Sequence, residues 1–419
     1  MAVHLLLAFS VALSPRESII SGPSTPMPPS KDPWYSTPDN FEQAAPGTIL
    51  RIRHAPGNLP SIVGSNCSAA YNILYRTTDS QYKPSWSVTT LFAPSIQPGS
   101  TNRPGSSVLS YQFPYNSVDV DSSPSYAVYS TPWHDLTYAL GHGWFVNVPD
   151  FEGPLASDVA AIEEAHAVLD SFRAIMEAGV GVAPDARLAL WGYSGGSIAS
   201  EWALEFQEQY APELNIIGAA LGGLVPNTTY VFDTVGDTEF ASHGMAGLLG
   251  VTSQYPAAYS YIISQLKTSG PYNKTGFLSI RNMSYEQAHA TFANQNMYDY
   301  FVGGRAVMQA PLVKRALQLN TIMTYHGVPQ TPLFIYKAIH DEVTPVNQTD
   351  DYVHRSCSLG VNILYERNTV GGHEDEFVNG EGRALAWLET VLDGSYEQHP
   401  ISGCEIRNVS VSSVNTGIY

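Results

Sequence analysis

Short apolar runs alternate with segments of helical periodicity along most of the chain. The runs that predict β-strands are residues 69–77, 87–92, 107–112, 144–148, 188–191, 215–221, 332–338 and 361–365. A helix with one apolar face is predicted at residues 156–177, and further helices at residues 198–204 and 383–392. Strands that alternate with helices are typical of an α/β fold with a parallel sheet.

The stretch from residue 223 to residue 325 interrupts this alternation. It is too long for a loop between two strands and must contain helices of its own. We expect it to form a cap over the rest of the molecule, although a segment that merely packs there would have the same pattern. The predicted organisation is a leader at 1–14, a core at 15–222 and 326–419, and a cap or lid subdomain at 223–325.

The most informative motif, Gly192-Tyr193-Ser194-Gly195-Gly196, lies between the predicted strand at 188–191 and a helix. A serine on such a turn, with glycine two positions before and after it, is typical of a nucleophile elbow. The glycines are needed because so tight a turn would press side chains at these positions together. The turn exposes the Ser194 hydroxyl and directs the N–H of Gly195 toward a developing oxyanion. An ordinary glycine-rich loop would not need glycine on both sides of a serine.

A serine nucleophile on this kind of turn requires an acid and then a histidine later in the chain. Asp341 is the best acid, because it directly follows the predicted strand at 332–338 and acids at the carboxyl ends of parallel strands face the ligand crevice. Glu342 is its rival by adjacency. Asp350 and Asp351 are weaker rivals, on a segment that resembles a solvated helix.

His373 is the predicted histidine. It follows the apolar run at 361–365 and two glycines, which would give a flexible loop able to bring an imidazole over the serine. Chain order leaves His354 and His399 as competitors. His354 falls in a helix-like segment, and His399 lies beyond the last predicted core helix.

Composition agrees with a large globular enzyme. The chain has 419 residues and a formal net charge of −18, which argues against nucleic-acid partners and against attraction to anionic membranes. No metal-ligand cluster, Walker motif or paired CxxC is visible, and we expect neither a metal nor a cofactor. The 14% content of charged residues, together with the apolar pieces of the predicted cap, favours a lipid-like acyl group.

The N-terminus predicts secretion. Residues 5–13 are an apolar run too short to span a bilayer, and they resemble the core of a signal peptide that ends near residue 14. The segment before it lacks Lys and Arg, and a buried strand is the alternative. No other long apolar stretch suggests a membrane span. Six glycosylation sequons support an extracellular location: Asn66, Asn227, Asn273, Asn282, Asn347 and Asn408.

Three cysteines fit an oxidising compartment with one disulfide and one cysteine left over. Cys357 and Cys404 flank the His373 segment, and a bridge between them would tie the C-terminal tail to the domain. Cys67, which lies inside a sequon, would then be the odd thiol.

Several further motifs accompany the elbow. They are DPWY at 32–35, YRTT at 75–78, SYQ at 110–112, PDFEG at 149–153, YAPELN at 210–215 and DEVTP at 341–345. Together with the elbow and the His373 loop, they resemble the fungal secretory lipase family from about residue 31 to residue 404. This resemblance implies an α/β-hydrolase fold with a mostly helical cap between the nucleophile and the acid.

The resemblance also implies a Ser194–Asp341–His373 triad, a Cys357–Cys404 disulfide and activity on acylglycerols and other esters. Backbone N–H groups of Asn116 and Gly195 would hold the oxyanion. The sequence departs from the family in two places. Asn116 stands where an aspartate is common, and Ser122 replaces a cysteine whose partner in the cap is also missing. These departures bear on the substrate range more than on the reaction.

The predicted function is that of a secreted serine hydrolase, acting on acylglycerols through an acyl-enzyme. A carboxylesterase or acyltransferase for shorter or more soluble esters is the main alternative, and a serine peptidase is a weaker one. A hydrolase fold that binds a ligand without catalysis is the alternative from another class. We expect an ester or lipid substrate as the partner, including one presented at a lipid–water interface.

Overall fold

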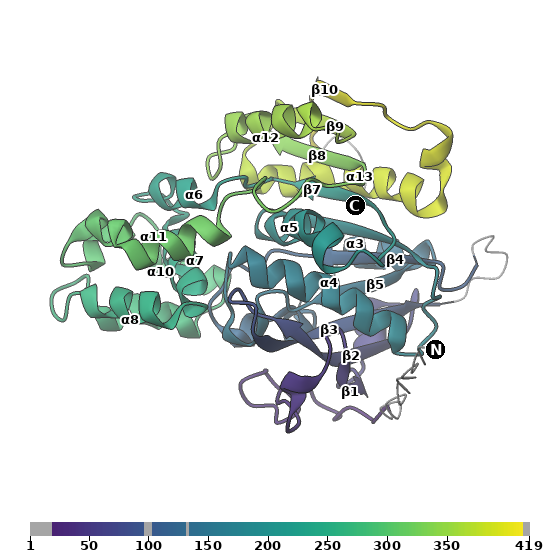
Figure 1. Ribbon diagram of the computed structural model, residues 1–419, viewed down its shortest axis with the longest axis horizontal. Helices are drawn as coiled ribbons and strands as arrows, with labels where there is room; N and C mark the ends of the chain where they lie inside the picture. The colour runs from purple at the N-terminus through teal and green to yellow at the C-terminus, as the bar shows by residue number, and fades with distance from the viewer. Residues whose placement is uncertain (1–18, 96–102, 131–133, 414–419) are drawn as a thin grey trace, which may run out of the picture.

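A ten-stranded sheet forms the centre of the protein. The computed structural model describes residues 19–95, 103–130 and 134–413, and its strands pair in the order β1-β2-β3-β5-β4-β6-β7-β8-β9-β10 (Figure 1). The strands are β1 (Ile49–His54), β2 (Cys67–Thr78), β3 (Pro84–Pro94), β4 (Ser107–Gln112), β5 (Phe145–Pro149), β6 (Arg187–Tyr193), β7 (Ile216–Gly222), β8 (Leu333–Ala338), β9 (Ile363–Asn368) and β10 (Cys404–Val409). From β5 to β10 all neighbours are parallel, whereas β1, β2, β3 and β5 pair antiparallel.

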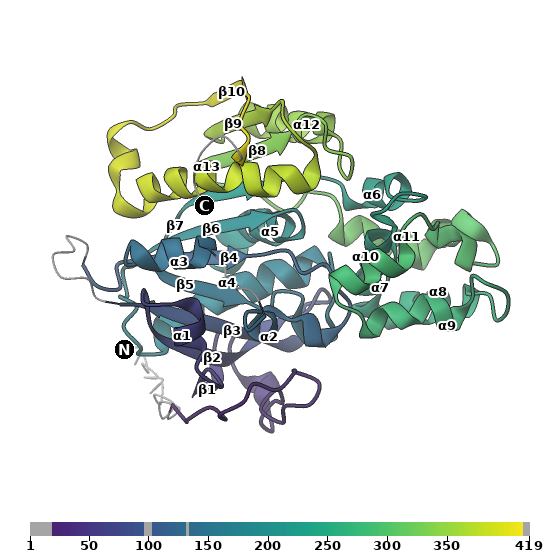
Figure 2. The same ribbon diagram turned by 180° about the vertical axis from the view of Figure 1, so that it is seen from behind.

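Helices cover both faces of this sheet. The helices are α1 (Leu59–Val63), α2 (Pro124–Ala127), α3 (His134–Gly141), α4 (Ala161–Glu177), α5 (Gly195–Tyr210), α6 (Thr228–Thr234), α7 (Ala241–Ser253), α8 (Pro256–Gln265), α9 (Lys274–Leu278), α10 (Tyr285–Phe292), α11 (Pro311–Asn320), α12 (Val346–Ser358) and α13 (His373–Asp393). Helices α4 and α5 lie on the face seen in Figure 1, and α13 lies on the opposite face, seen in Figure 2.

Alternate residues of the central strand feed two separate cores. Leu188 and Leu190 of β6 pack with α4 and α5, whereas Ala189 and Trp191 pack with α3 and α13. This alternation follows from the two-residue period of a strand, and it explains why β6 is apolar from Leu188 to Trp191.

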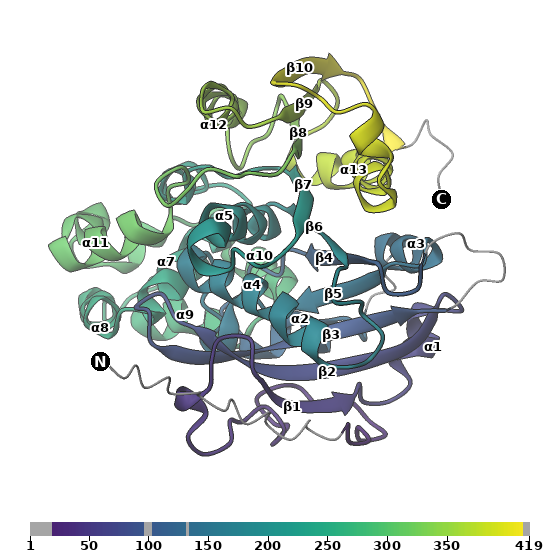
Figure 3. The same cartoon turned by 45° about the vertical axis from the view of Figure 1, so that its right-hand side comes forward.

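The chain between β7 and β8 forms a separate group of helices, α6 to α11, that we call the helical insertion. It lies at one end of the molecule, beyond the sheet (Figures 1 and 3). Its interior is continuous with the core on the α4–α5 side of the sheet, since Met245, Phe277 and Tyr300 belong to the same buried cluster as Leu188. The insertion is therefore packed onto the domain.

Two helices differ from the sequence prediction. Helix α4 begins at Ala161, not at residue 156, because residues 156–160 form a turn in which Ala156 and Val159 have positive φ angles of 46° and 55°. Helix α13 begins at His373, ten residues before the predicted start. His373 is thus the first residue of a long helix, and the flexible histidine loop expected from the sequence is wrong.

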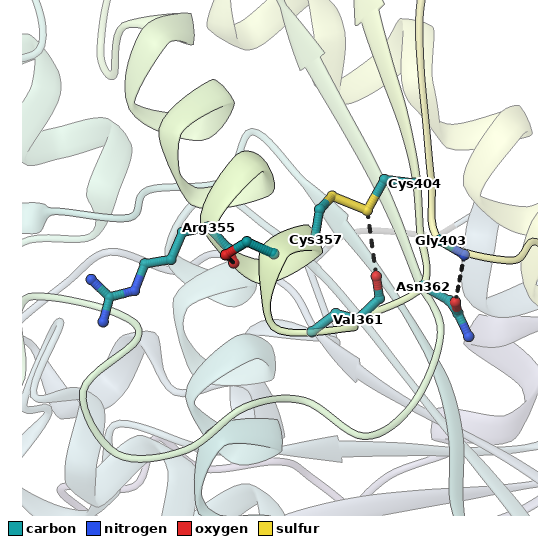
Figure 4. The surroundings of a disulfide bond; sticks show 7 residues. Arg355, Cys357, Val361, Asn362, Gly403 and Cys404 are labelled. Carbon is teal, nitrogen blue, oxygen red and sulfur yellow. Dashed lines mark hydrogen bonds between the residues drawn. A yellow bond between two sulfur atoms is a disulfide. The ribbon is translucent and has the colours of Figure 1, made fainter.

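A disulfide joins Cys357, near the end of α12, to Cys404, the first residue of β10, with 5.9 Å between the two Cα atoms (Figure 4). Beside it, the N–H of Gly403 donates to Oδ1 of Asn362. Cys67 is buried and has no disulfide partner. The disulfide predicted from the sequence is confirmed, and it ties the edge strand to the domain.

In the parts of the chain that the structure describes, no helix combines the length and apolar character needed to cross a membrane. The predicted leader at 1–14 lies outside the described residues.

Candidate active site

Three side chains from separate strand ends meet in one hydrogen-bonded line. Nε2 of His373 lies 2.8 Å from Oγ of Ser194, and Nδ1 of the same ring lies 2.6 Å from Oδ2 of Asp341. Because a carboxylate can only accept, Nδ1 carries a proton and Nε2 is free to accept the proton of the serine hydroxyl. All three residues are buried, with at most 7% of their surface exposed.

Packing explains both glycines of the elbow. Ser194 follows β6 directly and precedes α5, with a positive φ of 52°. A Cβ at Gly192 would collide with the backbone of Gly196, which is the crowding expected from the sequence. A Cβ at Gly196 would collide with the carbonyl oxygen of Gln112 on β4, a contact that only the folded sheet reveals. The strained turn, which costs roughly 1–3 kcal/mol, is thus held by its surroundings.

Asp341 is held by its own loop and by a buried lysine. Its Oδ1 accepts hydrogen bonds from the N–H groups of Val343 and Thr344, at 3.0 and 2.8 Å. Its Oδ2 lies 2.7 Å from Nζ of Lys337, whose side chain is fully buried. Burial alone would raise the pKa of Asp341, but Lys337 and His373 outweigh it and hold that pKa well below its usual range. Asp341 is therefore ionised.

Lys337 did not enter the sequence prediction. It lies on β8, four residues before Asp341, and its ammonium group also donates to the carbonyl oxygen of Leu224 at 3.2 Å. A lysine in the otherwise apolar run at 332–338 was the available signal. Its role depends on the ion pair with Asp341, which forms only in the folded protein.

The other candidate acids and histidines occupy different places. Oε2 of Glu342 accepts the backbone N–H of His373 at 2.9 Å, so it fixes the start of α13 and not the imidazole. Asp350 accepts a hydrogen bond from the Tyr365 hydroxyl at 2.9 Å. The remaining candidates, Asp351, His354 and His399, are exposed.

A residue of the elbow, Tyr193, also holds the backbone of His373. Its carbonyl oxygen accepts a hydrogen bond from the hydroxyl of Tyr193, the residue before Ser194. Tyr193 is buried and its ring lies against the imidazole, with 5.3 Å between the ring centroids. The residue that the elbow motif leaves variable therefore positions the histidine.

The predicted oxyanion residues lie together beside Ser194. Gly195 begins α5, where backbone N–H groups are free of helical partners. Asn116 lies over it, since a Cβ at Gly195 would collide with Oδ1 of Asn116. Asn116 has a positive φ of 39°, and both of its neighbours are anchored. The Tyr115 hydroxyl accepts from the N–H of Glu152 at 2.9 Å, and the Ser117 hydroxyl donates to the carbonyl oxygen of Met283 at 2.9 Å.

A cavity borders Ser194. Its lining combines apolar residues with a few polar ones: Asn116, Asp158, Val159, Ser194, Gly195, Ile198, Val225, Thr228, Val231, Phe232, His243 and Val343. Thr228, Val231 and Phe232 come from α6 and His243 from α7, so the helical insertion forms one wall. A largely apolar lining of this kind suits an uncharged organic group.

Asp158, which lines this cavity, belongs to a group of buried carboxyl side chains. Burial raises the pKa of Asp158 to about 7 and that of Glu163 to about 8. Burial, followed by neighbouring carboxylates, raises the pKa values of Glu152 and Glu164 well above the usual range. These groups are therefore largely neutral in mildly acidic solution.

Within residues 19–95, 103–130 and 134–413, no three His, Cys, Asp or Glu side chains are grouped so that they could hold a metal ion.

The six sequons differ in how accessible they are. Asn282, Asn347 and Asn408 are exposed, whereas Asn227 is partly buried. The side-chain amide of Asn66 donates to the carbonyl oxygen of Thr137 at 3.2 Å. Asn273 caps α9, with its side-chain oxygen accepting from the N–H of Gly276 at 3.0 Å.

Comparisons with known proteins agree with this geometry. A model of the family described as "Secretory lipase" matches residues 133–399. "Trichothecene C-3 esterase" of Fusarium sporotrichioides is 46% identical over 398 residues, covering 92% of this chain and 89% of that protein. "Lipase A" of Arthroderma benhamiae is 33% identical, covering 94% and 85%. The crystal structure of Candida antarctica lipase A matches with a TM-score of 0.81 and 27% identity, covering 94% and 91%. These likenesses confirm the predicted α/β-hydrolase fold.

Proposed function

We propose that this chain, which belongs to the secretory lipase family, hydrolyses carboxylic esters with Ser194 as the nucleophile. The main support is the chain of hydrogen bonds that runs from Ser194 through His373 to Asp341, beside a cavity that Ser194 lines. Membership of a family of lipases and esterases supports ester hydrolysis independently.

The proposed reaction has two steps, and the same imidazole moves the proton in both. Oγ of Ser194 bonds to the ester carbonyl carbon while its proton passes to Nε2 of His373. The N–H groups of Gly195 and Asn116 stabilise the resulting oxyanion. The bond to the alcohol oxygen then breaks, and His373 gives that oxygen its proton. In the second step, water attacks the acyl-enzyme, gives a proton to His373 and releases the acid as Ser194 regains its hydrogen.

Asp341 and Lys337 serve this cycle electrostatically. An ionised Asp341 fixes the imidazole tautomer and stabilises the imidazolium that forms twice per turnover. Lys337 keeps Asp341 ionised in a site where burial would otherwise favour its neutral form. The lysine therefore acts through the aspartate and does not contact the substrate.

For the substrate, we propose uncharged esters and include acylglycerols among them. The apolar residues of the cavity and the family's lipases support an acyl group of lipid type. A compact ester of a small polycyclic alcohol is the second candidate. It is supported by the 46% identity to a trichothecene C-3 esterase and the 40% identity to a probable trichothecene esterase of Stachybotrys chartarum.

We also propose that the protein is secreted and that its leader is residues 1–14. The family's description as secretory and the Cys357–Cys404 disulfide support an oxidising, extracellular location. Among the sequons, Asn282, Asn347 and Asn408 are the best placed for glycosylation because they are exposed. The helical insertion would serve as a cap, since it supplies one wall of the cavity.

The experiment is a substrate panel on the purified protein. It would contain p-nitrophenyl esters of increasing chain length, tributyrin, triolein and a C-3-acetylated trichothecene, each with wild type and Ser194→Ala. We expect wild type to hydrolyse uncharged esters and Ser194→Ala to be inactive. Hydrolysis of triolein would favour the lipase, and hydrolysis of the acetylated trichothecene without triolein would favour the second candidate. Wild type that cleaves no ester would overturn the proposal.

A further inference from the structure

A second histidine, His243, lines the same cavity as Ser194. It lies in the first turn of α7, on the wall formed by the helical insertion, and its side chain is partly exposed. His243 was not among the residues expected to act in the reaction. Because it lines the same cavity as Ser194, it is a candidate for substrate recognition.

The hydrogen bonding of His243 fixes which ring nitrogen carries the proton. Nδ1 lies 3.1 Å from the carbonyl oxygen of Phe240, at the start of the same helix. A carbonyl oxygen can only accept, so Nδ1 is the protonated nitrogen and Nε2 of the neutral ring carries a lone pair. His243 therefore presents an acceptor and no donor at Nε2.

The surroundings of His243 keep its ring neutral. The ring packs edge-on against Tyr285, with 5.2 Å between the centroids, and lies 6.0 Å from the ring of Phe240. Burial, followed by repulsion from His373 when that ring is protonated, lowers the pKa of His243 to about 4, and His289 acts in the same direction. The acceptor at Nε2 is thus present throughout the neutral and mildly acidic range.

Within the described residues, no side chain or backbone N–H donates to Nε2 of His243. Of the other polar side chains that line the cavity, Asn116 lies beside Gly195, and Asp158 and Thr228 complete the set with Ser194. An ester group has only acceptor oxygens and cannot satisfy this nitrogen. A substrate would have to supply a donor from elsewhere in its structure.

We propose that Nε2 of His243 accepts a hydrogen bond from a hydroxyl group that the substrate carries near its scissile ester. This inference rests on the proposed ester hydrolysis and narrows its substrate class. Partly acylated polyols and hydroxylated cyclic alcohols fit this site, whereas a fully acylated substrate leaves Nε2 unpaired. The site would therefore favour esters that carry a free hydroxyl group over simple esters that lack one.

The test uses two esters that share an acyl group and differ in hydroxyl groups, glycerol monobutyrate and propyl butyrate. His243→Phe keeps a ring in place but removes the acceptor. We expect it to lower kcat/KM for glycerol monobutyrate about tenfold, mainly through KM, and to change that for propyl butyrate less than about twofold. His243→Gln should recover part of the loss because its amide oxygen can accept.

His289→Phe is the matched control, because His289 lies beside Tyr285 and is not among the residues that line the cavity. It should leave the ratio of the two kcat/KM values unchanged. Equal losses on both esters in His243→Phe, or no loss on either, would overturn the role of His243 and leave ester hydrolysis standing. Wild type that hydrolyses neither ester would instead overturn the proposed function, and this inference with it.

Discussion

The ammonium group of Lys337 lies 2.7 Å from Oδ2 of Asp341, and both side chains are fully buried. The same carboxylate oxygen is 2.6 Å from Nδ1 of His373. One anionic oxygen thus contacts two groups that can carry positive charge, and one of them, Lys337, is fixed in the strand that precedes the acid. This pairing accounts for an aspartate that stays ionised although it is buried.

Replacing the lysine should disturb both stability and pH dependence. Lys337→Met leaves Asp341 as a buried charge without its cation, which costs about 3–5 kcal/mol of unfolding free energy. The pKa of Asp341 should rise, so the acid limb of kcat/KM should move to higher pH. Urea denaturation and a pH–rate profile measure the two effects, and Lys314→Met, at an exposed lysine of α11, is the control. An unshifted acid limb would show that Lys337 does not set the charge of Asp341.

The sign of the Asp341 effect follows from its lowered pKa. In wild type, its contribution to stability is complete above the unfolded-state pKa of about 3.9 and is lost only as pH falls toward the much lower folded-state value. In Lys337→Met this contribution should already decline in mildly acidic solution. The quantity to measure is therefore the difference in unfolding free energy between Lys337→Met and wild type as a function of pH.

Glu163 should make the protein less stable as solutions become alkaline. Burial raises its folded-state pKa to about 8, so its contribution is complete below the unfolded-state pKa of about 4.3 and is lost as pH rises to about 8. Glu163→Gln removes this titration. The urea midpoint of the variant should fall less than that of wild type between pH 5 and pH 8. Glu208→Gln, at an exposed position, should behave as wild type, and parallel curves for all three proteins would refute the prediction.

Ser117 should connect the helical insertion to the oxyanion site. Its hydroxyl donates to the carbonyl oxygen of Met283 and accepts from the N–H of Asp119, beside the strained Asn116. Ser117→Ala removes one anchor of that loop and should lower kcat about tenfold, less than the roughly 100-fold or greater loss of a whole oxyanion donor. KM should change little, and Ser117→Thr should retain activity because it keeps the hydroxyl. A change confined to KM would place the effect in substrate binding instead.

The disulfide should stabilise the fold without serving catalysis. Cys404→Ala opens a loop of 47 residues, and chain entropy predicts a loss of about 4 kcal/mol. Activity on a soluble ester should persist below the new melting transition, because β10 lies at the sheet edge. Cys67→Ala is the control, since Cys67 has no disulfide partner. A large loss of kcat in folded Cys404→Ala would contradict this separation.

The parts of the site that sequence could predict are those governed by local geometry. The elbow is one, because the strand, the glycines and the helix are neighbours in the chain. The placement of Asp341 and His373 is another, because strand ends along one edge of a parallel sheet converge. The structure brings the His373 ring to Ser194 and Asp341 to the other side of that ring.

Other features depend on contacts between distant residues. Residues 373–382 are mostly polar, so the apolar pattern does not indicate that α13 already begins at His373. Gly380 is needed within this helix because a Cβ there would collide with Tyr336 on β8. Strand β10 has mostly exposed residues and is defined by its pairing with β9 and by the disulfide. Tyr193 and Lys337 belong to the site only because they contact His373 and Asp341, respectively. No periodicity in the chain carries such information.

The identity of the nucleophile is the central claim, and labelling with a p-nitrophenyl alkylphosphonate tests it most directly. We expect one equivalent of p-nitrophenol per protein chain and a single phosphonyl group, located by peptide mass spectrometry on Ser194. Ser194→Ala should take up no label and should lose at least about 10³-fold of the ester hydrolysis rate. A label on another residue, or a Ser194→Ala protein that still hydrolyses esters at the wild-type rate, would contradict the account.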